Sequence, residues 1–454
     1  MKKIFQFFLA LTMLLTSAFM TAQNIMVREK RVEESVLKVR SDSIKSTISN
    51  LVSKHTRHNL STKSNSLQGI GAAAQLILQK LDTYAKGSAH MSVQKYEYRA
   101  GGEKTRLGKE ITLSNIVANL KGSSESCDRV IILLAHYDSR SFDNSDSTAF
   151  APGANDNGSG VAALMEIARI LSTQPLPVTI KLMFLSGEEH GLLGAAHMAS
   201  IAREEGWNIS AVINNDMIGN SRSSGTELSS NMILRVFSES IPFAETPEMK
   251  RIREFNSAEN DSESRQLARY IKEISERYVD NLKISLIYRN DRFGRGGDHT
   301  PFNRLGFSSV RLCEYYENYD RTHQIPGIRD GKEYGDLISG VDIEYVKKNT
   351  QANLATIMNL ALAPAKPSKV TIDISALSSS TIISWDQPKD GQKPYGYYIL
   401  IRETDKSMWE KKFFVKGTST EIPYSKDNHF FAVQSVNENG NESLATFAVG
   451  GSVR

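Results

Sequence analysis

The sequence contains little cysteine, tryptophan or proline: two Cys, three Trp and twelve Pro in 454 residues. Two cysteines far apart in the chain, Cys127 and Cys313, exclude a disulfide framework, and their spacing excludes a thiolate metal site. We expect both to be buried free thiols. The chain also lacks a large excess of either charge sign, since its net charge is only +4. This balance excludes the basic stripe that a nucleic-acid partner requires.

Long hydrophobic runs are missing except at the start of the chain. There, a basic MKK precedes the apolar run IFQFFLALTMLL, and small residues follow in TSAFMTAQ. This pattern is typical of a secretory signal peptide, which we place at residues 1–23. The run is too short to cross a bilayer comfortably. We therefore expect a secreted or periplasmic protein with no membrane span after signal removal.

Segments with the pattern of buried strands alternate with amphipathic helical segments. We expect strands at 92–98, 113–120, 130–138, 178–186 and 209–219, and helices at 67–81, 161–171 and 191–205. The alternation predicts an α/β three-layer sandwich with a largely parallel central sheet, within a catalytic domain at 24–363. Residues 221–290 look like an insertion, a Ser-rich loop followed by helices such as 262–279. Strands at 283–290 and 308–314 and a helix at 341–362 complete the domain.

The composition changes after the linker PAKPSK at 364–369. Residues 370–454 contain short alternating strands with turn signals about every ten residues, which indicates a small all-β sandwich. This stretch resembles a fibronectin type III domain, with Trp385 in the core, although that family's corner tyrosine is not evident. Because it contains no candidate site residue, we expect a spacer or stabilising role.

Polar residues follow three consecutive predicted strands and begin one predicted helix. They are one imidazole and five carboxylates: His136, Asp138, Asp156, Glu188, Glu189 and Asp216. The carboxyl ends of parallel strands meet at one edge of a sheet, so these groups are expected to converge. Carboxylates gathered this closely repel one another unless a cation neutralises them. Imidazole and carboxylate ligands together favour zinc.

The adjacent Glu188 and Glu189 point most directly to a reaction. Neighbouring side chains can face different directions, so one can bind a metal while the other holds the attacking water. A metal lowers the pKa of water, and a nearby carboxylate can accept the proton. This combination hydrolyses an amide without a covalent intermediate.

Six blocks of sequence carry a resemblance to a known family. They are HYDS (136–139), GANDNGSGVAALMEIAR (153–169), FLSGEEHGLLGA (184–195), NNDMIG (214–219), GGDHTPF (296–302) and RTHQ (321–324). In this order and spacing, they resemble the cocatalytic zinc exopeptidases of the aminopeptidase Y and bacterial leucyl aminopeptidase type. The resemblance covers roughly residues 43–362. Glutaminyl-peptide cyclotransferases share the scaffold.

The resemblance implies two zinc ions held by five ligands: His136, Asp156, Glu189, Asp216 and His323. His136 and Asp216 would bind one zinc, and Glu189 and His323 the other. Asp156 would bridge both, and the family commonly has an unusual peptide bond after this residue.

The resemblance also implies the groups around the metals. Glu188 would be the general base, and Asp138 would hydrogen-bond His136 and fix its tautomer. His299 would lie beside the site without binding metal.

The sequence departs from the family just before GGDHTPF. Several members carry a tyrosine there that stabilises the oxyanion, whereas this chain has RNDRFGR with Arg292 and Arg295. We hypothesise that an arginine stabilises the oxyanion or binds a substrate carboxylate. The alternative is that both are solvated loop residues. Asp298 is a further substrate-binding candidate.

Taken together, the residues and the resemblance predict a zinc-dependent aminopeptidase acting on peptide substrates. A glutaminyl-peptide cyclotransferase is the first alternative. It normally uses one zinc and surrounds an N-terminal glutamine with aromatic residues, but Trp207 is the catalytic region's only tryptophan and is predicted away from the metal edge. The remaining alternatives are a dipeptidase, a carboxypeptidase and a binding protein that has kept the fold without the activity.

Overall fold

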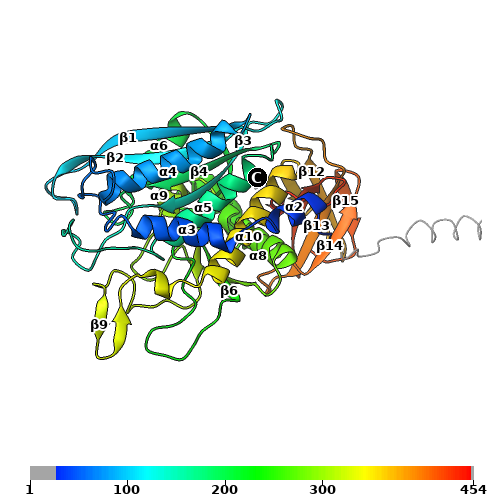
Figure 1. The fold of residues 1–454 in the computed structure, drawn as a ribbon. Helices are drawn as coiled ribbons and strands as arrows, with labels where there is room; N and C mark the ends of the chain where they lie inside the picture. The colour runs from blue at the N-terminus through cyan, green and yellow to red at the C-terminus, as the bar shows by residue number, and fades with distance from the viewer. Residues whose placement is uncertain (1–26, 451–454) are drawn as a thin grey trace, which may run out of the picture. The chain divides into compact units, whose positions relative to one another are not determined.

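The computed structural model describes residues 27–450, and the predicted signal peptide lies outside them (Figure 1). Contacts divide the chain into two compact units, and the boundary between them falls between Leu362 and Ala363. Residues 390–392 are grouped with the larger unit, which precedes this boundary. Among the described residues, no helix has both the length and the apolar character needed to cross a bilayer.

The larger unit is built on an eight-stranded sheet of order β1-β2-β4-β3-β5-β8-β6-β7. Its strands are β1 (Met91–Gly101), β2 (Glu110–Leu120), β3 (Arg129–His136), β4 (Thr179–Leu185), β5 (Asn208–Asn215), β6 (Ile233–Ser238), β7 (Lys283–Ile287) and β8 (Ser309–Glu314). The central strands β4, β3, β5 and β8 run parallel. Antiparallel pairs join β1 to β2, β2 to β4 and β6 to β8. The predicted parallel sheet therefore forms the centre of a mixed one.

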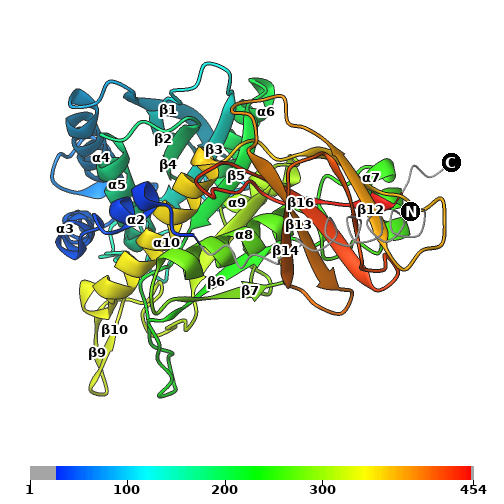
Figure 2. The same ribbon diagram turned by 90° about the vertical axis from the view of Figure 1, so that its right-hand side faces the viewer.

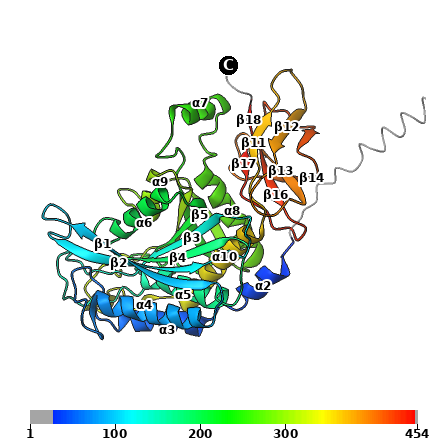
Figure 3. The ribbon, with the colours of Figure 1, turned by 90° about the horizontal axis from the view of Figure 1, so that it is seen from above.

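Helices cover both faces of this sheet and complete the predicted three layers (Figure 3). The helices of this unit are α2 (Lys30–Val36), α3 (Ser41–Val52), α4 (Gly69–Lys86), α5 (Gly158–Leu171), α6 (Leu193–Glu204), α7 (Pro247–Asn256), α8 (Glu263–Tyr278), α9 (His299–Arg304) and α10 (Ile343–Leu362). Figure 3 shows α3, α4 and α5 on one face and α6 and α9 on the other.

Strand β3 holds the centre of the core and ends at the site. All eight of its residues are buried, as the continuous apolar run of a strand covered on both faces requires. Ile132 and Leu134 pack in one cluster with Met198 of α6 and Phe302 of α9. Each buried aliphatic side chain contributes about 1.5–3 kcal/mol, so the strand is a rigid support for His136 at its end.

Helix α5 begins at Gly158, two residues after Asp156. The side chain of Asn157 caps it by accepting a hydrogen bond from the amide of Gly160. A Cβ on Gly160 would lie only 2.4 Å from the carbonyl oxygen of Asn215 in β5. Glycine therefore lets the helix approach the sheet closely, which places Asp156 near the strand ends. The Asp156–Asn157 peptide bond is cis, and so is unusual as expected.

The segment 221–290 forms the expected helices and the strand expected at 283–290, but it also contains a strand, β6, that was not predicted. It contributes β6 and β7 to the central sheet, in addition to α7 and α8. Strand β6 is only six residues long and is interrupted by Arg235, so its apolar pattern is weak. The hairpin of β9 (Gly327–Arg329) and β10 (Lys332–Tyr334) was also not predicted, and Figure 2 shows it projecting from this unit.

The smaller unit consists of two four-stranded sheets, β15-β12-β11-β18 and β14-β13-β16-β17. Its strands are β11 (Ser368–Ile372), β12 (Thr381–Asp386), β13 (Gly396–Glu403), β14 (Lys411–Val415), β15 (Ser419–Ile422), β16 (His429–Val436), β17 (Thr446–Phe447) and β18 (Val449–Gly450). Trp385 packs in the core between strands of both sheets, as expected. The likeness to fibronectin type III stays a prediction.

Both cysteines are free thiols. Cys313 is buried as expected, whereas Cys127 is only half-buried because it lies in the loop before β3.

Candidate metal centre

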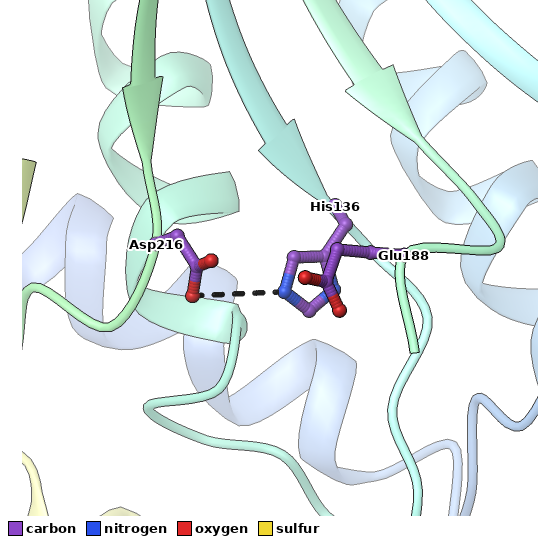
Figure 4. Close-up of side chains that lie close together, drawn as sticks. All are labelled: His136, Glu188 and Asp216. Atoms are coloured by element: carbon purple, nitrogen blue, oxygen red, sulfur yellow. Dashed lines mark ion pairs between the residues drawn. The ribbon is translucent and has the colours of Figure 1, made fainter. Parts of the chain in front are cut away.

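The first group of potential ligands gathers where three neighbouring strands end. His136 is the last residue of β3, Glu188 follows β4 and Asp216 follows β5. One ligand atom from each lies within 4.8 Å of the others. Figure 4 shows the three side chains pointing into one space, with Nε2 of His136 3.8 Å from Oδ1 of Asp216. The structure therefore brings these predicted residues together through the sheet topology.

The second group contains Asp156, Glu189 and His323, whose ligand atoms also lie within 4.8 Å of one another. Nε2 of His323 is 2.9 Å from Oε1 of Glu189 and 3.0 Å from Oδ2 of Asp156. His323 lies in the loop after β8 and has φ 59°, a left-handed conformation that non-glycine residues rarely adopt. Such backbone conformations persist where the surroundings hold them, often at functional sites.

Asp156 links the two groups. Its Oδ1 is 3.3 Å from Nε2 of His136, and its Oδ2 is 3.0 Å from Nε2 of His323. One carboxylate thus presents one oxygen to each imidazole, which is the geometry a bridging ligand needs. The roles of all five candidate ligands stay predictions.

The imidazoles and carboxylates of the two groups shift one another's pKa values. Burial lowers the pKa of His323, but Glu189 and Asp156 outweigh it and raise that pKa to about 10. His136 shows the same balance, because its carboxylate neighbours raise its pKa well above the ordinary value despite burial. The imidazoles in turn hold the pKa of Asp156 well below its usual range, although burial opposes this. The charged forms of the two imidazoles and of Asp156 therefore stabilise one another.

The donor set fits divalent cations. Nε2 of His136 is a buried polar atom without a hydrogen-bond partner among residues 27–450, although three carboxylates surround the ring. Imidazole nitrogen and carboxylate oxygen are ligands that zinc accepts. His136, Asp156 and Asp216 would hold one ion, and Asp156, Glu189 and His323 the other.

Glu188, the third member of the first group, is half-buried. Removal from water and the neighbouring Glu189 and Asp216 raise the pKa of its carboxyl well above the ordinary value, although His136 opposes this. A raised pKa makes the carboxylate a stronger proton acceptor, which suits the predicted general base.

Asp138 contacts both glutamates as well as the imidazole. Its Oδ1 lies 3.5 Å from Nδ1 of His136, while that nitrogen is 3.2 Å from the backbone carbonyl oxygen of Asp138. Its carboxylate accepts hydrogen bonds from the amides of Glu188 and Glu189 at 3.4 and 3.2 Å. A further bond comes from Nδ2 of Asn59 at 2.7 Å. Asp138 thus orients the glutamate pair in addition to the predicted contact with His136.

Two further residues support Asp156 and were missed from the sequence. Arg57 is buried and donates to the carbonyl oxygens of Tyr137 and Gly153, at 2.6 and 2.9 Å, and so joins the two ends of the loop between β3 and α5. Asp336 accepts the amides of Asn155 and Asp156 at 2.8 and 2.7 Å. Burial and the charge of Asp156 raise the pKa of Asp336 to about 7. Neither residue stands in a motif or at a predicted strand end, so no local signal could have found them.

The two arginines predicted to bind substrate lie in different environments. The guanidinium of Arg292 is half-buried and donates to Oε2 of Glu317 at 2.6 Å and to Oδ1 of Asp291 at 3.3 Å. Arg295 is exposed. Their roles at the oxyanion or a substrate carboxylate stay predictions, and the carboxylate partners of Arg292 compete with such contacts.

Asp298 and His299 lie at the start of α9, and both are fully buried. Burial and the charges of Asp138 and Asp216 raise the pKa of Asp298 to about 8, although His136 opposes this. His299 makes a 2.9 Å contact through Nε2 with the carbonyl oxygen of Asn290 and belongs to neither group of potential ligands.

Two imidazole–carboxylate groups at the carboxyl edge of parallel strands are an arrangement that suits a metal-dependent hydrolase. Residues 115–330 match the family described as "Peptidase family M28". A "Probable zinc metalloprotease" of Leptosphaeria maculans is 37% identical over 423 residues, which cover 92% of this chain and 97% of that protein. Another, from Pyricularia oryzae, is 38% identical over 412 residues, covering 89% and 81%. The chain belongs to peptidase family M28, which confirms the expected family.

Solved structures share the fold. LapA of Legionella pneumophila has a TM-score of 0.53 and 19% identity, covering 76% of this chain and 80% of that one. The aminopeptidase from Aneurinibacillus sp. strain AM-1 has a TM-score of 0.50 and 13% identity, covering 72% and 95%. At these identities the likeness confirms the α/β fold class only.

Proposed function

We propose that this peptidase is a zinc-dependent aminopeptidase with two zinc ions, which removes single residues from the N-termini of peptides. The observation that carries the proposal is Asp156, whose two oxygens face His136 and His323 at 3.3 and 3.0 Å. Relatives named zinc metalloproteases support the choice of metal. The aminopeptidases among the similar structures support the specificity.

In the proposed reaction, bound zinc supplies Lewis acidity that polarises the scissile carbonyl and makes water easier to deprotonate. Glu188 accepts the proton from the attacking water and passes it to the leaving amine nitrogen. Asp138 holds the glutamate pair in place through the two backbone amides. The surrounding carboxylates attract a positively charged α-amino group, which favours substrates with a free N-terminus.

The proposal is tested with matched peptides that carry a free or an acetylated N-terminus, with and without a zinc chelator. We expect release of single N-terminal residues from the free peptides only, loss of activity with chelator, and two zinc ions per chain by elemental analysis. Cleavage of acetylated peptides would exclude an aminopeptidase. One zinc per chain together with pyroglutamate formation from a Gln-initiated peptide would identify a cyclotransferase instead.

Zinc binding is expected to release at least two protons per chain near pH 7. The pKa of His323 is about 10 and that of His136 is well above its ordinary value, so both rings are protonated at this pH without metal. Each ring must lose its proton to bind zinc. The overall affinity for the zinc pair should therefore rise at least about 100-fold per pH unit between pH 6 and 7. Calorimetry in buffers of different ionisation enthalpy measures the protons, and release of fewer than two contradicts the expectation.

We also propose that the protein is exported to the periplasm or the medium, on the pattern of residues 1–23. N-terminal sequencing of the protein from a secreting host tests this. We expect the mature chain to begin after Ala22 or Gln23, whereas an intact Met1 would contradict export.

A further inference from the structure

Two arginines contact the candidate terminal ligands, and each contacts the oxygen that faces away from the imidazole. In the second group, Nε of Arg140 is 2.9 Å from Oε2 of Glu189, whereas Oε1 is 2.9 Å from Nε2 of His323. The side chain of Glu189 is 5% exposed and that of Arg140 is 20% exposed. One oxygen of Glu189 is thus occupied by a cationic donor, and the other faces the imidazole of His323.

The first group repeats this arrangement with a different arginine. Nη2 of Arg311, on β8, is 3.2 Å from Oδ2 of Asp216, whereas Oδ1 faces Nε2 of His136 at 3.8 Å. Arg311 is fully buried, and its Nη1 is 2.9 Å from Oδ2 of Asp291. The guanidinium is therefore fixed between two carboxylates and cannot turn away from Asp216 without leaving a buried charge unpaired.

Asp156 differs from these two carboxylates in the way its oxygens are used. Both of its oxygens face imidazoles, at 3.3 and 3.0 Å. A bridging ligand needs both oxygens for metal, whereas a terminal ligand can offer either one or two. The arginine contacts fall on the two predicted terminal ligands.

We propose that Arg140 and Arg311 are positioning residues that commit Glu189 and Asp216 to offer one oxygen each to their metal. The inference rests on the proposed two-zinc function. A carboxylate whose second oxygen is held by a guanidinium cannot swing to chelate the ion through both oxygens. Coordination positions then stay open for water and substrate, as a catalytic zinc site requires.

Arg140 is the sharper test, because its side chain reaches solvent and its replacement is less disruptive than that of buried Arg311. We expect Arg140→Met to weaken one of the two zinc ions by about 10- to 100-fold and to leave the other unchanged. Arg140→Lys keeps the positive charge but loses the planar guanidinium. Its zinc affinity should therefore fall between those of Arg140→Met and the wild-type protein. Competition with a chromophoric chelator measures both affinities, and thermal unfolding confirms that each variant is folded.

The coordination change has its own signature. With cobalt in place of zinc, the visible absorption of Arg140→Met should change, because Glu189 is free to bind through both oxygens. Arg311→Lys should weaken the other zinc, so that each arginine affects a different ion. The control is Arg203→Met, an exposed arginine of α6, which should keep both affinities and the cobalt spectrum.

Unchanged or tighter zinc binding in Arg140→Met, with an unchanged cobalt spectrum, would overturn the positioning role while leaving the two-zinc function intact. Equal weakening of both ions by Arg140→Met would also overturn it, since Glu189 is the candidate ligand that Arg140 contacts. A wild-type protein that binds no zinc would refute the proposed function itself and the positioning role with it.

Discussion

Glu188→Gln is expected to lower kcat/KM by about 100- to 10,000-fold while both zinc ions stay bound. The amide has nearly the same size as the carboxylate, but it cannot accept the proton of the attacking water. Glu188 is not needed as a ligand in the proposed arrangement, because His136 and Asp216 supply the first metal and Asp156 bridges. The loss should therefore appear in kcat rather than in metal content.

Steady-state kinetics on an aminoacyl substrate and elemental analysis of the same preparation make this measurement. Glu204→Gln, an exposed glutamate on α6, is the matched control and should behave like wild type. If Glu188→Gln instead loses one zinc, then Glu188 is a ligand, as its place within 4.8 Å of His136 and Asp216 also permits. Full activity in this variant would contradict the proposed mechanism.

Asp156→Ala is expected to remove measurable peptidase activity and to weaken both zinc ions by at least about 100-fold. Its carboxylate is the one predicted ligand shared by the two groups, so its loss should reach both sites at once. In the metal-free protein the same change removes a charge that raises the pKa of His323. The pKa of that ring should therefore fall, which NMR titration can follow without any metal.

Asp143→Asn serves as the control for this variant, because Asp143 is exposed and lies in the loop between β3 and α5. It should keep both zinc ions and full turnover. Loss of one ion only in Asp156→Ala would contradict the bridging role and would favour two separate metal sites.

The convergence of the site residues follows from local patterns together with one topological rule. His136, Glu188 and Asp216 each follow a buried apolar run, and parallel strands align their carboxyl ends. The sequence alone therefore places these side chains at one sheet edge. Asp156 was placed with them by its position at the start of a predicted helix. His323 was predicted only through a motif of the family resemblance, because a lone histidine has no distinctive local pattern.

Only the tertiary structure shows which residues support the site. Arg57 donates a hydrogen bond to the carbonyl oxygen of Tyr137, 80 residues away in the sequence. Asp336 accepts one from the amide of Asn155, 181 residues away. Strand β6 likewise depends on its partners β7 and β8 for burial. Periodicity and spacing report only on neighbours within an element, whereas these contacts join loops brought together by packing. The sequence by itself thus determined the central parallel strands and the types of side chain at their ends, and only the folded chain decided which oxygen of each carboxylate faces an imidazole and which faces an arginine.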